Sequence, residues 1–208
     1  MQTAAQVVAL TALLFLLQEL LRHCGKWILW TLFLAVPAAL TPYWIAVNDF
    51  GPFLWIKCYS VFFCMCWGSA LRFTWLGERP WARLTIPLLL AANVLEATVV
   101  DLLESGMAHR VNGLAGLLLI ATLPYGVAST RVDTGSRCRD LYCGASLCWI
   151  CGYTIWNWTF VCLNYPSLAE YHVAVLASAL IIAVIDSRRW LQTRACTLGL
   201  NLLAMATI

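Results

Sequence analysis

Long apolar runs recur along the whole chain and are separated by short polar connections. Each run is close to the roughly 20 residues that an α-helix needs to cross the hydrocarbon core of a bilayer. Of the 208 residues, 62% are hydrophobic and 11% are charged, whereas about a quarter of a soluble domain is charged. We therefore expect an all-α fold, a polytopic transmembrane helical bundle that forms a single domain over residues 1–208. The predicted helices cover residues 3–21, 27–45, 53–76, 84–104, 112–129, 141–163, 168–185 and 189–207.

The basic residues are concentrated in every second connection between these helices, and only Lys57 and Arg110 lie elsewhere. Because positively charged loops stay in the cytoplasm, we expect the basic connections inside and both termini on the non-cytoplasmic side. The segment 189–207 is interrupted by polar residues; if it does not cross, seven helices remain and the carboxyl terminus lies inside. The basic connections carry Arg22, Lys26, Arg72, Arg79, Arg83, Arg131, Arg137, Arg139, Arg188, Arg189 and Arg194.

Composition also excludes several classes of function. The net charge of +3 and the short connections leave no solvated basic face for nucleic acid. Ten cysteines are present, but most lie within apolar runs, where a free thiol packs as a small apolar residue. We predict no metal site and no cofactor, because no pair of cysteines has a second pair or a histidine nearby. The expected partners are membrane lipids and a small-molecule or ion substrate, and the sequence is compatible with a homo-oligomer.

The fourth predicted helix carries the most informative polar residues. Asn93, Glu96, Asp101 and Glu104 recur at helical spacing, so they share one stripe of its surface. Glu96 lies near the bilayer midplane, and ionisable groups at that depth are functional candidates because burying them is costly. With no basic residue evidently level with it, we expect a protonated carboxyl that suits proton coupling or acid–base catalysis.

On the third predicted helix, Lys57 lies at about the depth of Asp101, so we expect an ion pair that keeps both residues charged. The result is an outward-facing polar pocket around Glu96, with Arg72 and Arg194 as candidates for a cytoplasmic-side gate. The predicted substrate- or ion-binding residues are Glu96, Asp101, Asn93, Lys57, Asn112 and Asn157. For Asn112, Asn157 and Asn201, a purely structural role in joining helices by hydrogen bonds stays open.

Three short stretches resemble a family of multi-pass membrane proteins that is classed only as a domain of unknown function. They are Asn93-Val-Leu-Glu96-Ala97, Trp156-Asn157 and Trp190-Leu-Gln-Thr-Arg194-Ala-Cys-Thr197-Leu. The resemblance implies a membrane bundle over nearly the whole chain and no particular activity. It singles out Glu96, Asn157 and Arg194, which the argument from buried polarity selects independently.

Our leading functional hypothesis is a transporter or channel for a small polar or cationic solute. The first alternative is an intramembrane enzyme acting on a lipid or isoprenoid, with Glu96 or Asp101 as acid or base. The second is a structural subunit of a larger membrane complex. No phosphate-binding glycine loop, H-E-x-x-H or G-x-S-x-G motif occurs in the sequence, which favours a function other than catalysis.

Overall fold

The computed structural model describes residues 4–208 and consists mainly of eight helical segments. The first is α1 (Ala4–Arg22), and the second is a continuous helix made of α2 (Lys26–Trp30), a π-helical turn η1 (Thr31–Ala35) and α3 (Val36–Val47). The others are α4 (Pro52–Phe73), α5 (Pro80–Leu103), α6 (Met107–Ala121), α7 (Leu147–Asn164), α8 (Ala169–Ile185) and α9 (Trp190–Thr207). The expected all-α bundle of about eight helices is confirmed; residue 3, where the first predicted helix begins, lies outside the described residues.

Five of the helices are long and apolar enough to cross a membrane. They are α1, the continuous helix Lys26–Val47, α4, α5 and the segment Pro166–Ile185, which contains α8. Large apolar side chains also lie exposed on the outside of the bundle, among them Leu16, Leu118 and Val184. A surface of this kind is unfavourable in water and favourable against lipid tails. The structure therefore indicates that the protein associates with a membrane.

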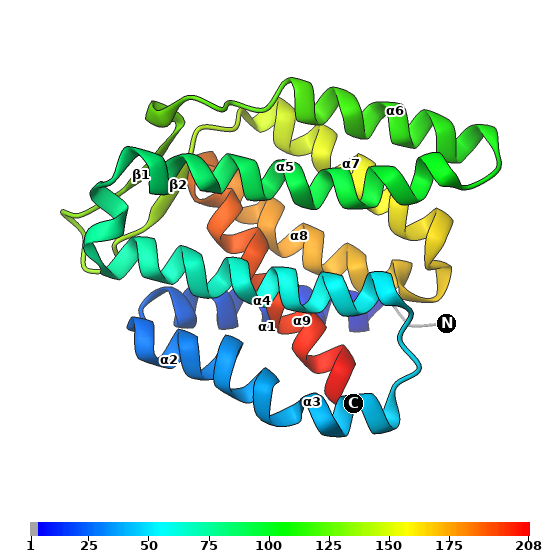
Figure 1. The fold of residues 1–208 in the computed structure, drawn as a ribbon, viewed down its shortest axis with the longest axis horizontal. Helices are drawn as coiled ribbons and strands as arrows, with labels where there is room; N and C mark the ends of the chain where they lie inside the picture. The colour runs from blue at the N-terminus through cyan, green and yellow to red at the C-terminus, as the bar shows by residue number, and fades with distance from the viewer. Residues whose placement is uncertain (1–3) are drawn as a thin grey trace.

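Most helices run along the long axis of the molecule, and α9 crosses them obliquely near the middle of the bundle (Figure 1). The connections α1–α2, α4–α5, α6–α7 and α8–α9 lie together at one end, which we call the basic end because it holds most of the arginines. The connections α3–α4, α5–α6 and α7–α8 lie at the opposite end, which we call the far end.

The segment between α6 and α7 differs from the prediction. Helices were expected over 112–129 and 141–163, but α6 already ends at Ala121 and α7 begins only at Leu147. Pro124 and Gly126 follow the end of α6, and neither favours continuation of a helix. Instead, strands β1 (Thr130–Val132) and β2 (Leu141–Cys143) form an antiparallel hairpin at the basic end, with Thr130 opposite Cys143.

Two hydrophobic cores flank α9. One includes Trp156 and Phe160 of α7, and Trp190 at the start of α9 belongs to it. The other includes Phe62 of α4, together with Cys196 and Leu202 of α9. Because α9 contributes to both cores, it joins the two halves of the bundle, and its remaining face is free to line the space between them. Short 3-10 turns, η2 (Trp75–Glu78), η3 (Val127–Ser129), η4 (Pro166–Leu168) and η5 (Ser187–Arg189), complete the connections.

Candidate functional site

The larger cavity lies towards the far end, between α4, α5, α7, α8 and α9, and has a volume of about 440 Å³. This volume falls within the range of small-molecule sites, which is about 300–1,000 Å³. Most of its wall is apolar, as at Phe160 and Leu202. The polar side chains in the wall are those of Lys57, Asn93, Asn157, Tyr165, Tyr171, His172, Arg194 and Asn201.

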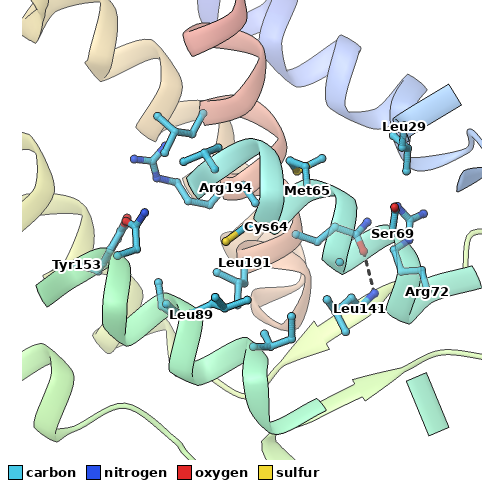
Figure 2. A pocket seen from close by; sticks show the side chains of 18 residues that line it. Leu29, Cys64, Met65, Ser69, Arg72, Leu89, Leu141, Tyr153, Leu191 and Arg194 are labelled. Atoms are coloured by element: carbon cyan, nitrogen blue, oxygen red, sulfur yellow. Dashed lines mark hydrogen bonds between the residues drawn. The ribbon is translucent and has the colours of Figure 1, made fainter. Parts of the chain in front are cut away.

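A smaller cavity of about 100 Å³ continues towards the basic end, between α4, α5 and α9. Figure 2 shows this cavity with Tyr153 and Arg194 towards one end and Arg72 and Leu141 towards the other. The two cavities have Asn93, Arg194 and Leu198 in common. These three side chains therefore lie at the border of the two cavities, and we call them the dividing wall.

Arg194 is the central side chain of this wall and is only 3% exposed. Its Nη2 donates a hydrogen bond to Asn157 Oδ1 at 3.1 Å and lies 3.5 Å from His172 Nε2. Because an amide oxygen only accepts, His172 donates its Nε2–H to the same Asn157 Oδ1, at 2.6 Å. The other nitrogens of Arg194, Nε and Nη1, are buried without a hydrogen-bond partner among residues 4–208. The guanidinium of Arg194 is thus held by a hydrogen bond at Nη2, whereas Nε and Nη1 have no hydrogen-bond partner among the described residues.

Lys57 forms an ion pair with Glu96, and not with Asp101 as the sequence predicted. Lys57 Nζ lies 2.8 Å from Glu96 Oε2 and 3.5 Å from the Asn93 carbonyl oxygen. The prediction of an unpaired Glu96 is therefore wrong, because the flexible lysine side chain spans the depth that separates the two positions. Glu96 Oε1 is buried and has no hydrogen-bond partner in the part of the chain that the structure describes.

Asp101 belongs to a separate cluster between α5, α6 and α7. Its side chain is fully buried and accepts hydrogen bonds from Asn112 Nδ2 at 2.6 Å and from Asn164 Nδ2 at 2.8 Å. His109 Nδ1 lies 3.0 Å from Asp101 Oδ1, the oxygen that also accepts from Asn164. Neither Asp101 nor Asn112 lines either cavity. Asp101 and Asn112 therefore lie outside the pocket that the sequence predicted. Their hydrogen bonds connect α5, α6 and α7 instead.

The basic end is closed by the hairpin. Arg72 is 4% exposed, and its Nη2 donates to the carbonyl oxygens of Arg22 and Cys138, each at 2.7 Å. It therefore lies beneath the hairpin rather than reaching towards water. Asp140, in the hairpin, is also buried and accepts from Arg22 Nη2 at 2.7 Å and from Gln192 Nε2 at 3.1 Å.

The protonation of Asp140 depends on these contacts. Burial alone would raise the pKa of this carboxyl, but the hydrogen bonds and charge of Arg22, with the hydrogen bond from Gln192, lower it below its usual range. The side chain therefore stays ionised at neutral pH. A second contact ties the same end together, because Glu19 of α1 pairs with Arg189, which precedes α9.

A family model for a family of unknown function, DUF5692, matches residues 1–208, the whole of this sequence. The chain belongs to the DUF5692 family. This confirms the resemblance drawn from the sequence motifs. No curated protein and no solved structure matches this DUF5692 chain.

Of the residues that the sequence singled out in this DUF5692 chain, the structure brings Lys57, Asn93 and Asn157 to the larger cavity. Glu96 adjoins it through its pair with Lys57. Arg194 was expected near the cytoplasmic surface, but its side chain contacts groups of α7 and α8 and separates the two cavities.

Sequence reasoning missed His172 and the two tyrosines of the cavity wall, Tyr165 and Tyr171. Each lies close to a helix end, which is where aromatic side chains of membrane proteins commonly anchor at the interface. No periodic signal set them apart from such anchors. Among residues 4–208, no group of three or more histidine, cysteine, aspartate or glutamate side chains is placed to hold a metal ion.

Proposed function

We propose that this protein is a multi-pass membrane carrier or channel for a small polar solute. One observation carries the proposal: two cavities lie in series between the far end and the basic end and are divided by Asn93, Arg194 and Leu198. Polar groups at such a depth are rare in membrane bundles and favour a solute pathway over a lipid-facing role. A scaffold protein would gain more from a filled core at this place.

The distribution of charge supports an orientation for this pathway. The basic end corresponds to the cytoplasmic side by the positive-inside rule, so both ends of the described chain lie on the opposite side. The larger cavity then faces outward. Arg72 and the hairpin, which close the smaller cavity at the basic end, correspond to a closed cytoplasmic gate.

The orientation can be tested with short epitope tags in intact cells and in permeabilised cells. A tag between Thr134 and Gly135, in the exposed turn of the hairpin, should be detected only after permeabilisation. A tag after Ser105, in the connection between α5 and α6, should be detected without it. The reverse pattern would invert the proposed orientation.

Transport itself is tested with purified protein in liposomes loaded with a mixture of small solutes, by measuring which solutes leave. We expect Arg194→Gln to reduce the rate about tenfold or more, because it removes the charge at the dividing wall. The matched control is Arg110→Gln, which changes an exposed arginine away from both cavities. If liposomes that contain the wild type release no tested solute faster than liposomes without protein, the proposal fails.

A second candidate is an intramembrane enzyme that acts on an amphipathic lipid. The apolar wall of the larger cavity favours it. Glu96 adjoins this cavity through Lys57, and its Oε1, buried without a partner among residues 4–208, could exchange a proton with a substrate. Lipid analysis of cells with and without the gene distinguishes the two. A carrier leaves its solute chemically unchanged, whereas an enzyme leaves a depleted lipid and a new product.

A further inference from the structure

The charges around the two cavities do not balance. Among residues 4–208, no aspartate or glutamate lines either cavity, while Lys57, Arg72 and Arg194 do. The guanidinium of Arg72 donates to the carbonyl oxygens of Arg22, Cys138 and Arg139. The charge of Lys57 is matched by Glu96 at 2.8 Å. Arg194 forms no ion pair with any described residue. Its guanidinium donates to Asn157, lies 3.5 Å from His172 Nε2 and lies 6.0 Å from the centre of the Tyr153 ring.

A guanidinium does not lose its proton in proteins, so Arg194 carries a full charge at the dividing wall. Of its five N–H hydrogens, those on Nε and Nη1 have no hydrogen-bond partner among the described residues. Buried charges in proteins are paired or coordinated, because an isolated one is strongly unfavourable. A partner for the charge of Arg194 would therefore be an anion, and residues 4–208 do not supply one.

We infer that the cavities bind an amphipathic organic anion whose carboxylate or phosphate group pairs with Arg194. This assignment rests on the proposed function for its role as cargo, although the binding itself does not require transport. It replaces the earlier expectation of a polar or cationic solute. A cation at the dividing wall would meet the unpaired guanidinium of Arg194, and the carboxylate of Glu96 is already paired with Lys57.

The surroundings of Arg194 fit both parts of such a ligand. Asn157 of α7 accepts from the guanidinium and is itself held by His172 of α8, which fixes the orientation of Arg194 before a ligand arrives. Guanidinium groups bind carboxylates and phosphates through paired, charge-assisted hydrogen bonds. The apolar body of the ligand would lie along Phe160, Leu198 and Leu202 in the larger cavity.

The inference is tested first on binding alone, with the purified full chain in detergent and thermal unfolding as the readout. The probes are sodium octanoate, octyl phosphate and octylammonium chloride, which share one apolar body and differ in headgroup charge. We expect both anions to raise the unfolding temperature of the wild type by a few degrees, because a ligand that binds only the folded state stabilises it. Octylammonium should leave the temperature unchanged.

Three variants locate the effect. Arg194→Gln should weaken octanoate binding roughly tenfold or more, since it removes a charge-assisted interaction. Arg194→Lys should retain part of the affinity, and Arg110→Gln all of it. If Arg194→Gln does not fold, the comparison of the three probes on the wild type decides alone. Equal stabilisation by octylammonium and octanoate, or none by either anion, would overturn the inference.

Two further experiments distinguish a lipid headgroup from a soluble anion, and anion binding from anion transport. In nanodiscs of phosphatidylcholine, adding phosphatidic acid should abolish the effect of octanoate if a lipid headgroup occupies Arg194, and should leave it intact if a soluble anion does. Anion binding without any flux in liposomes would refute the proposed transport and keep the inference. Flux of neutral or cationic solutes that is unaffected by octanoate and by Arg194→Gln would support the proposed transport and refute the inference.

Discussion

Two buried ionisable side chains of this protein, Asp101 and Arg194, differ in how many of their polar atoms have hydrogen-bond partners. Asp101, between α5, α6 and α7, is fully buried and contacts Asn112, Asn164 and His109. Arg194, on α9, is nearly as buried but keeps two nitrogens without partners among residues 4–208. Both residues lie in the same apolar bundle, and both were candidates by the same argument from buried polarity.

The difference separates a structural site from a functional one. A buried charge whose hydrogen bonds are all made within the fold holds its neighbours in place. A buried charge that lacks partners destabilises the fold and is retained only where something outside the chain uses it. Each of the following experiments tests this distinction by measuring the stability of variants.

The largest effect is expected from Asp101→Ala. The substitution leaves Asn112, Asn164 and His109 without their common acceptor, so the free energy of unfolding should fall by about 3 kcal/mol or more. Reversible unfolding in mixed micelles measures it. The control is Glu104→Ala, which removes an exposed carboxyl at the end of the same helix and should change stability by less than about 0.5 kcal/mol. Similar values for the two variants would contradict the structural role of Asp101.

Arg194→Gln should act in the opposite direction. Without a bound anion, replacing the unpaired guanidinium by an amide should raise the free energy of unfolding by about 1 kcal/mol. The same assay measures it, in buffer free of organic anions, with Arg110→Gln as the exposed control. A loss of stability comparable to that of Asp101→Ala would place Arg194 among the structural charges.

The pair of Lys57 and Glu96 is intermediate, because its two charges neutralise each other but Glu96 Oε1 lacks a partner in the described part of the chain. A double-mutant cycle of Lys57→Met and Glu96→Gln should give a coupling energy of about 1–2 kcal/mol. Each single variant should be less stable than the double variant, since it leaves one charge alone. Additive effects would mean that the 2.8 Å contact does not stabilise the fold.

The smallest effect concerns Asp140 at the basic end. Its pKa is lowered in the folded state, so its ionisation adds stability above the unfolded pKa of about 3.9, and this stability is lost as the pH falls through the lower, folded value. Between about pH 5 and pH 3 the wild type should lose about 1 kcal/mol more than Asp140→Asn. Thermal unfolding across this range measures the difference. Parallel curves for the two proteins would show that the contacts of Asp140 add no net stability.

The fold followed from the sequence because the bilayer limits the choices. Eight apolar segments of helical length could only become helices, and that prediction was confirmed. The prediction was wrong between α6 and α7, where residues 122–146 are not helical membrane spans and include a hairpin of β1 and β2 at the basic end. Apolar residues such as Leu141 and Cys143 are buried there against other parts of the chain, so their hydropathy resembles that of a helix that faces lipid.

The contacts of the site were less predictable than its residues. Helical spacing placed Lys57, Asn93 and Asn157 on inward faces, and the structure puts all three at the larger cavity. Pairing depends instead on how far neighbouring helices are shifted along one another, which the sequence does not encode locally. Lys57 therefore meets Glu96 rather than Asp101, and Arg194 of α9 donates to Asn157 of α7.

The position of α9 has a consequence for the way this protein is made. Arg194 and Leu198 complete the wall between the cavities, and Gln192 of the same helix binds Leu141 and Asp140 of the hairpin. All of these partners leave the ribosome before α9 does. Until α9 arrives, the nascent protein holds polar groups at membrane depth with a central helix missing. Those groups are the surface that an insertase or chaperone in the membrane would need to shield during synthesis.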